Sequence, residues 1–132
     1  MTRPSMLAAS AAGLLALAAA LTPAAAQGVR PAPAVQTRDQ FAGFTRLRTG
    51  DSVRVAIRTW SIAGGQRIAA LELPFRGLAI VELRAGVAVT VIDGRRTTRR
   101  EGDLWVVPAG TAMGVETDDD TAVVQVTVVG GG

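Results

Sequence analysis

The chain has 132 residues and a formal net charge of +3, with 14 basic residues against 11 acidic ones. It contains no His and no Cys, and because every basic residue is Arg it also lacks Lys. The commonest ligands of zinc, copper and iron are therefore missing, as are the thiol nucleophile, the usual general base at neutral pH and the amine of Schiff-base chemistry. The charge balance alone does not indicate a nucleic-acid partner, and none is expected.

Residues 1–26 have the pattern of a cleavable secretory signal peptide, with its apolar part in a signal helix. A basic residue lies near the start, residues 6–21 form an uncharged Ala/Leu run, and small residues precede Gln27. We expect cleavage between Ala26 and Gln27 and a periplasmic or secreted mature protein. An uncleaved anchor is the alternative. The apolar run is short for a membrane span and Pro23 soon interrupts it, so we expect no stable membrane anchor after cleavage.

Residues 27–50 are expected to form an N-terminal arm or linker. Two prolines near its start indicate extended chain. Apolar residues then follow at three-residue spacing, namely Phe41, Phe44 and Leu47. This spacing predicts one or two helical turns over residues 37–48, with one apolar face covering the core.

Residues 51–129 change to the two-residue alternation that is typical of β-strands. Turn-forming residues separate the expected strand segments, which lie at 52–62, 67–73, 78–83, 87–92, 95–100, 104–107, 112–117 and 121–129. Asp93-Gly94, between two alternating segments, predicts a hairpin with a type I′ turn. Gly130–Gly132 is expected to be a flexible tail. About eight short strands with turns between them predict an all-β sandwich or barrel.

The stretch from Gly102 to Thr117 organises this domain. Five residues separate Gly102 from Pro108, one separates Pro108 from Gly110, two separate Gly110 from Met113, and three separate Met113 from Thr117. Gly102 permits a tight turn, Pro108 ends a strand and Gly110 permits a positive φ angle. The spacing resembles the second motif of the cupins, which has His at the Met113 position and Asn at the Thr117 position. The resemblance implies a double-stranded β-helix, or jelly-roll barrel, that forms a homodimer through sheet contacts.

The resemblance also implies where a cupin would hold its metal. The His of the second motif is one ligand, and the first motif supplies two His and one Glu. These three positions fall on Leu71, Leu73 and Ala79. A register slipped by one residue places the two His positions on Glu72 and Pro74 instead. Neither register restores a ligand set, and the thioether of Met113 suits Cu(I) at best. We therefore expect no metal and no cofactor.

An apolar pocket at the barrel mouth is the remaining candidate site. Its candidate ligand-binding residues are Met113, Trp105, Leu71, Leu73, Trp60 and Val115. The alternative for Met113 is that it fills the place where the metal stood, and the alternative for both Trp residues is a core position. No catalytic residue is assigned.

Four arginines lie on the predicted strand at 95–100. Strand alternation separates Arg95 and Arg99 from Arg96 and Arg100, so they cannot form one patch. A charged, solvated sheet edge is therefore expected here rather than an anion site.

The sequence thus predicts an exported, cupin-like and non-catalytic module that binds a small apolar ligand or has a structural, oligomerising role. One alternative is an enzyme that retains a cupin pocket, either oxygenase- or isomerase-like with a metal or based on carboxylates. Catalysis based on carboxylates requires at least two of four candidate acid–base residues to lie inside the barrel. These four residues are Glu72, Glu82, Glu116 and Arg76. A second alternative is a metal-binding cupin that recruits Met113 and Glu72.

Overall fold

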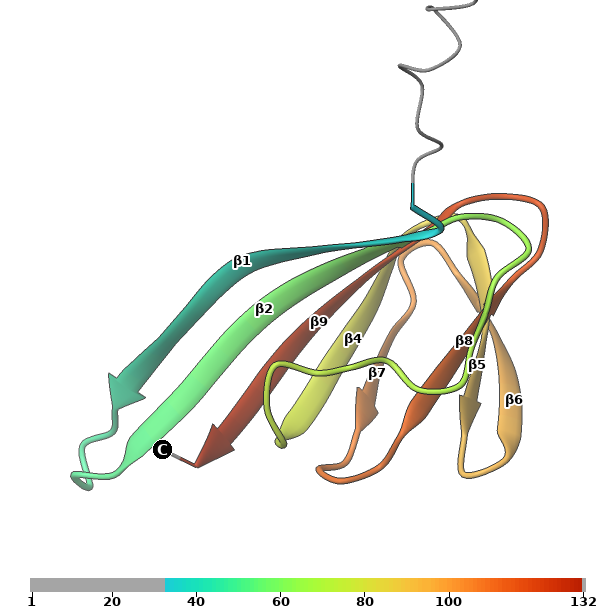
Figure 1. Ribbon diagram of the computed structural model, residues 1–132. Coiled ribbons are helices and arrows are strands. Elements are labelled where there is room, and N and C mark those ends of the chain that lie inside the picture. Colours follow the sequence, from blue (N-terminus) through green and yellow to red (C-terminus); the bar gives the residue numbers. More distant parts are fainter. Residues whose placement is uncertain (1–32, 132) are drawn as a thin grey trace, which may run out of the picture. The chain divides into compact units, whose positions relative to one another are not determined.

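The computed structural model describes residues 33–131, in which every regular element is a β-strand (Figure 1). The strands are β1 (Val35–Arg46), β2 (Ser52–Ile62), β3 (Arg67–Ile68), β4 (Leu78–Ala85), β5 (Val87–Ile92), β6 (Arg95–Arg100), β7 (Leu104–Val107), β8 (Met113–Thr117) and β9 (Ala122–Gly131). The expected signal peptide and its helix lie outside the described residues. Between residues 33 and 131 no helix is long and apolar enough to cross a membrane.

The strands form two antiparallel sheets, as expected for a jelly-roll barrel. The five-stranded sheet has the order β1-β2-β9-β4-β7, and the four-stranded sheet has the order β3-β8-β5-β6 (Figure 1). β9 is the last described strand in the sequence, but it lies in the centre of its sheet between β2 and β4. The inward side chains of both sheets form one core that includes Val81, Leu83, Val115, Val124 and Val126. This apolar core holds the fold without disulfides.

β2 shows how strand alternation divides apolar residues between two faces. Trp60 and Ile62 are buried in the core. Val53, Val55 and Ile57, which occupy the alternate positions earlier in the strand, are only half-buried and lie on the outer face of the five-stranded sheet. An apolar residue in this strand is therefore not necessarily a core residue.

The predicted turns are confirmed at the positions where glycine is needed. Asp93 and Gly94 have φ angles of 50° and 75°, the two positive values that a type I′ turn requires. Gly102 and Gly110 have φ angles of 91° and 82°. Both lie in the left-handed region that a residue with a Cβ rarely adopts, so the glycines position the two turns around β7.

The predicted helix over residues 37–48 is wrong, because this segment is mostly β1. It pairs with β2 from Val35↔Ile62 to Arg46↔Ser52, with a bulge near Gln40. In a strand, Phe41 and Phe44 lie on opposite faces, and they are 53% and 71% exposed. Their three-residue spacing therefore makes no core-covering face. The backbone of β2 offers hydrogen bonds along its whole length, which favours a strand.

Two other predicted boundaries are corrected. Only Arg67 and Ile68 of the segment 67–73 form a strand, and residues 69–77 cross between the sheets without regular structure (Figure 1). Pro74 lies within that crossing and has no backbone N–H to donate to a sheet. Gly130 and Gly131, expected in a flexible tail, instead continue β9 and pair with β2.

Candidate functional site

The positions that the cupin resemblance assigns to metal ligands come together in one small cavity. Its lining residues are Leu71, Leu73, Ala79, Val107, Thr111 and Met113. The first of the two registers is therefore the one that the fold adopts. Glu72, from the slipped register, is exposed and lines a different hollow. The cavity has a volume of about 20 Å³, which is room for roughly one water molecule.

Backbone contacts fix the two sides of this cavity. Met113 begins β8, and its carbonyl oxygen accepts a hydrogen bond of 2.9 Å from the N–H of Leu71. The crossing segment is thereby held against the start of β8. On the other side, the N–H of Thr111 donates to the carbonyl of Pro108 at 3.1 Å, which closes the corner after β7.

Met113 belongs to the core. Its side chain is 5% exposed, and its Sδ lies 3.4 Å from Nε1 of Trp105, which donates a hydrogen bond to it. A buried indole N–H needs an acceptor, and the thioether supplies a weak one. The sulfur is therefore engaged inside the protein.

These residues do not fit a metal ion. Three of the four ligand positions carry hydrocarbon side chains, and the fourth carries the thioether that Trp105 already contacts. Within residues 33–131, no three His, Cys, Asp or Glu side chains gather into a group that could hold a metal. Met113 and Glu72, the pair that could recruit a soft metal, line different hollows. That the protein binds no metal stays a prediction.

The other predicted pocket residues, Trp105, Trp60 and Val115, do not line this cavity. Val115 is fully buried between the sheets. Trp60 lies in the core and borders the hollow that Arg58 and Glu72 also line. Ligand binding by the six predicted residues stays a prediction.

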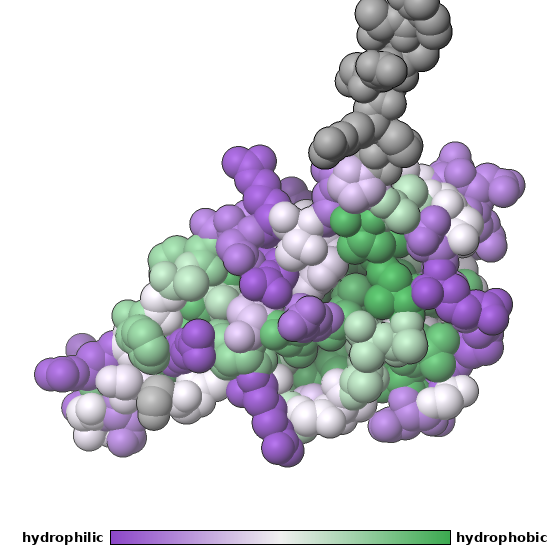
Figure 2. All heavy atoms as spheres, in the orientation of Figure 1, coloured by the Kyte–Doolittle hydropathy of each residue, from purple (hydrophilic) through white to green (hydrophobic). Residues whose placement is uncertain are grey.

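A shallow hollow outside the cavity is the nearest place for a small apolar ligand. It has a volume of about 300 Å³, and Leu71, Leu73 and Phe75 provide its apolar part, with Arg76 beside them. Figure 2 shows hydrophobic residues gathered where the segment between β3 and β4 crosses the visible face. The hollow is open to solvent, unlike the enclosed pockets that bury most of a ligand.

Thr117, at the Asn position of the motif, has a structural role that the sequence did not reveal. Its buried hydroxyl donates a hydrogen bond of 2.6 Å to the carbonyl of Ala63 and accepts one of 3.0 Å from the N–H of Gln66. It thereby ties the turn before β3 to the end of β8. The signal in the sequence is a hydroxyl residue at the last inward position of a strand.

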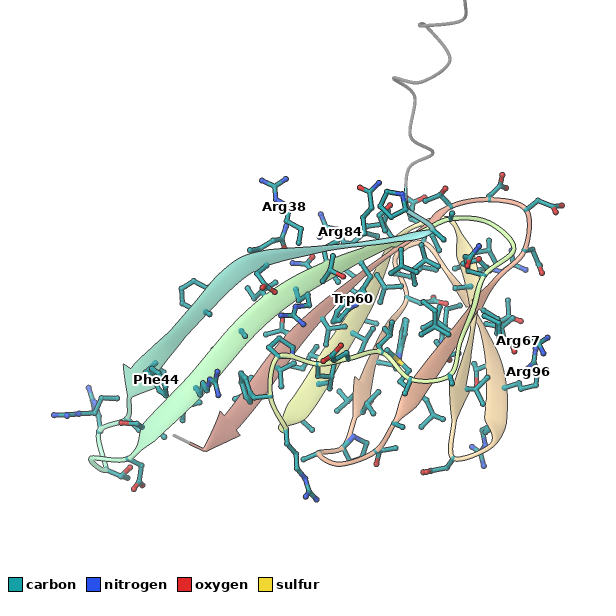
Figure 3. All side chains as sticks on the ribbon, in the orientation of Figure 1. Arg38, Phe44, Trp60, Arg67, Arg84 and Arg96 are labelled. Carbon is teal, nitrogen blue, oxygen red and sulfur yellow. The ribbon has the colours of Figure 1, made fainter. Side chains whose placement is uncertain are left out.

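Glu116 lies on the outer face of the four-stranded sheet. Arg67 contacts it at 3.0 Å and Arg96 forms a hydrogen-bonded ion pair with it, and Figure 3 shows the two arginines close together. The hydrogen bond from Arg96 lowers the pKa of Glu116 below its ordinary value. The carboxylate is therefore stabilised in its charged form, which is unlike a general acid.

The other candidate acid–base residues also lie away from the core. Glu82 is on the outer face of the five-stranded sheet, 3.4 Å from Arg84. Glu72 and Arg76 are exposed on the crossing segment. The structure therefore brings no two of the four candidate residues together inside the barrel.

The outer face of the five-stranded sheet carries two neighbouring rows of mostly apolar side chains, which we call the apolar rows. The strand register aligns the first row as Phe41, Ile57, Thr127, Ile80 and Val106, one residue from each strand. The second row is Gly43, Val55, Val129 and Leu78. A polar row of Arg38, Thr59, Gln125 and Glu82 follows on the other side and ends at Leu104.

Several of these apolar side chains are open to solvent. Phe41 and Val106, at the two ends of the first row, are each 53% exposed, and Leu78 is 42% exposed. Soluble monomers rarely expose a contiguous apolar surface that crosses a whole sheet. The apolar rows are therefore a candidate interaction surface.

Comparisons with known proteins give structural matches only. No protein-family model matches the sequence, and no curated protein matches it. A conserved protein of unknown function from Streptococcus pyogenes matches with a TM-score of 0.52 and 26% identity, over 71% of this chain and 73% of that chain. The cupin domain of an XRE family transcriptional regulator from Enterobacter cloacae matches with a TM-score of 0.56 and 12% identity, over 73% of this chain and 96% of that one.

An enzyme is also among the similar structures. A salicylate 1,2-dioxygenase from Pseudaminobacter salicylatoxidans matches with a TM-score of 0.52 and 14% identity, over 74% of this chain but only 27% of its own. The matches thus include a domain of a regulator, part of an enzyme and a protein of unknown function. They agree on the fold and do not select an activity.

Proposed function

Because this chain has the fold of the cupin superfamily, we propose that it is an exported, non-catalytic cupin that pairs with a second copy of itself. In this proposal it works without a metal or cofactor, and its role is structural and oligomerising. The signal-peptide pattern of residues 1–26 supports export. The apolar lining and small volume of the central cavity support the absence of catalysis there.

The apolar rows are the observation that carries this proposal. The outer face has five strands of four to twelve residues, spaced about 4.8 Å apart, and measures on the order of 500 Å² in projection, of which the apolar rows are a part. Side-chain relief adds to that area, which makes it comparable with the roughly 800 Å² per partner of a standard interface. Val106 and Phe41 provide exposed apolar side chains at both ends of the face.

A second copy suits this surface because the surface complements itself. In a twofold pair the same patch is used on both partners, so apolar rows meet apolar rows. The polar row carries one base, Arg38, and one acid, Glu82. Two copies of that row therefore meet without net repulsion.

The test compares two matched substitutions in the mature protein. Val106→Arg places a charge in the apolar rows, and Val87→Arg places the same charge on the outer face of the four-stranded sheet. The two native side chains are 53% and 43% exposed, so neither change disturbs the core. Sedimentation velocity of protein recovered from the periplasm measures the oligomer, and its intact mass gives the cleavage site, expected before Gln27.

We expect the native protein and Val87→Arg to be dimers, and Val106→Arg to dissociate with a Kd at least about tenfold higher. A native protein that stays monomeric at about 100 μM would exclude a dimer of useful affinity. A dimer that Val106→Arg leaves intact, or that both variants weaken equally, would show that the apolar rows are not the interface.

A further inference from the structure

Two edge strands, β6 and β7, border one side of the molecule. β6 ends the four-stranded sheet and β7 ends the five-stranded sheet. Their connecting turn is bound to β4, since Gly102 donates to the carbonyl of Leu83 at 2.9 Å and Leu83 donates to that of Asp103 at 3.0 Å. A pocket of about 520 Å³ lies along the length of β6. Its lining residues are Ile92, Asp93, Arg95, Thr97 and Arg99.

Strand alternation places Arg95, Thr97 and Arg99 on the inner side of β6. Thr97 pairs with Thr90 of β5, whose side chain is 1% exposed and faces the core. Thr97 and Arg99 are half-buried, whereas Arg95, Arg96, Thr98 and Arg100 are exposed. The solvated edge that the sequence predicts is therefore interrupted on the inner side of the strand, at Thr97 and Arg99.

Arg99 is held in a fixed position. Its guanidinium carbon lies 4.3 Å from the centre of the Trp105 ring, and its Nε donates a hydrogen bond of 3.1 Å to Oγ1 of Thr90. These contacts orient the planar group. Within residues 33–131 neither terminal nitrogen of Arg99 has a protein acceptor, so both remain for a ligand.

The two arginines of the pocket also have no counter-ion in the described part of the chain. Arg58, Arg67, Arg84 and Arg96 each pair with a carboxylate. Neither Arg95 nor Arg99 forms such a pair with any of residues 33–131. The one acid that lines the pocket is Asp93, in the exposed turn at its rim.

From this arrangement we infer that the pocket binds a small anion, carrying a carboxylate or a phosphate group, between Arg95 and Arg99. The Cα atoms of these residues are about 13 Å apart along the strand, so two long side chains can converge over Thr97. Guanidinium groups bind both kinds of anion through paired, charge-assisted hydrogen bonds. The Thr97 hydroxyl adds a donor, and Ile92 provides an apolar wall.

The experiment titrates the mature protein with two probes, inorganic phosphate and benzoate, at constant ionic strength set with chloride. Trp105 lies against Arg99, so its fluorescence reports binding, and calorimetry measures Kd independently. We expect saturable binding of at least one probe with a Kd of about 1 mM or tighter. The probe that binds more tightly distinguishes a phosphate ligand from a carboxylate one.

Three variants locate the site. Arg95→Gln is expected to raise Kd about tenfold, because it removes one charge-assisted contact from an exposed residue that makes no ion pair within residues 33–131. Asp93→Asn is expected to lower Kd, since it removes the acid at the rim, and Asn also suits the positive φ of this turn. Arg100→Gln removes the same charge from the opposite face of β6 and is expected to leave Kd within about twofold.

Two results would overturn the inference. One is that neither probe binds saturably up to about 50 mM. The other is that Arg95→Gln and Arg100→Gln weaken binding equally, which would indicate general charge attraction. Circular dichroism of each variant shows that the fold is retained, so a loss of binding is assigned to the pocket.

Discussion

Replacing Met113 with Ala tests whether this residue fills the centre of the barrel as a core side chain. Met113 is almost fully buried, and it lines a cavity of about 20 Å³. Truncating a buried Met to Ala costs about 2–5 kcal/mol, and the cost grows with the void that remains. The new void joins the existing one, and the N–H of Trp105 also loses its acceptor. We therefore expect a loss of about 3 kcal/mol in the free energy of unfolding.

A second variant separates packing from the sulfur contact. Met113→Leu keeps most of the volume but removes the acceptor of the Trp105 N–H. A volume-conserving change costs less than about 1.5 kcal/mol, and a buried donor left unpaired costs about 1–3 kcal/mol. We expect a total near 2 kcal/mol, clearly smaller than the loss for Met113→Ala.

Urea unfolding of the mature proteins, followed by tryptophan fluorescence, measures both losses by linear extrapolation. All samples need the same protein concentration, because a dimer stabilises the folded chain by mass action. For a domain of about 100 residues, 3 kcal/mol corresponds to a fall in Tm of about 12–24 °C. A loss below about 1 kcal/mol for Met113→Ala, with an unchanged m-value, would refute a tightly packed Met113.

Two further predictions concern acid and metal. The pKa of Glu116 is held below its ordinary value of 4.5 by Arg96, so its ion pair stabilises the fold above about pH 4.5 and this stabilisation is lost as the pH falls through the lowered pKa. We expect Tm to fall on acidification and Glu116→Gln to make that fall shallower; parallel curves would show that the pair contributes nothing. Elemental analysis of native protein purified without chelators is expected to find less than about 0.1 equivalent of any transition metal, and one copper or iron per chain would contradict the proposed function.

Much of the β-domain follows from local signals in the sequence. Asp93-Gly94 specifies its turn, and Gly102 and Gly110 adopt the positive φ angles that their places in the motif predict. Such features are local because a turn needs only its own residues to have the right backbone preference. The bounds of β5, β6 and β7 are those expected, since a turn signal stands at each end.

The errors arise where packing over long distances decides. Phe41 and Phe44 have a helical spacing, but their segment forms a strand because its backbone pairs with the edge of β2. Both side chains are exposed as a result. The strand pattern of residues 52–62 also left open which face is covered, and Val55 and Ile57 lie on the outer face. A period of two says which residues share a face and does not say which face is covered.

The sequence predicted which positions belong to the candidate site, but it did not predict the shape of the cavity that they line. Motif spacing identified Leu71, Leu73, Ala79 and Met113, and only the fold chose between the two registers. For the pocket of Arg95 and Arg99, strand alternation predicted that these two residues share a face, separate from Arg96 and Arg100, but it did not predict a pocket. Which pair faces inward depends on the partner strand.

The central place of β9 has a consequence for when this protein can fold. β2 and β4 do not touch through their backbones, because β9 lies between them and pairs with both. Val53, near the start of the domain, is joined to Gly131. The five-stranded sheet therefore cannot close until nearly all of the described chain has been synthesised, and such non-local pairing is slow. Late folding of this kind fits the proposed export, because a chain that crosses a membrane as an unfolded polypeptide must not become compact beforehand.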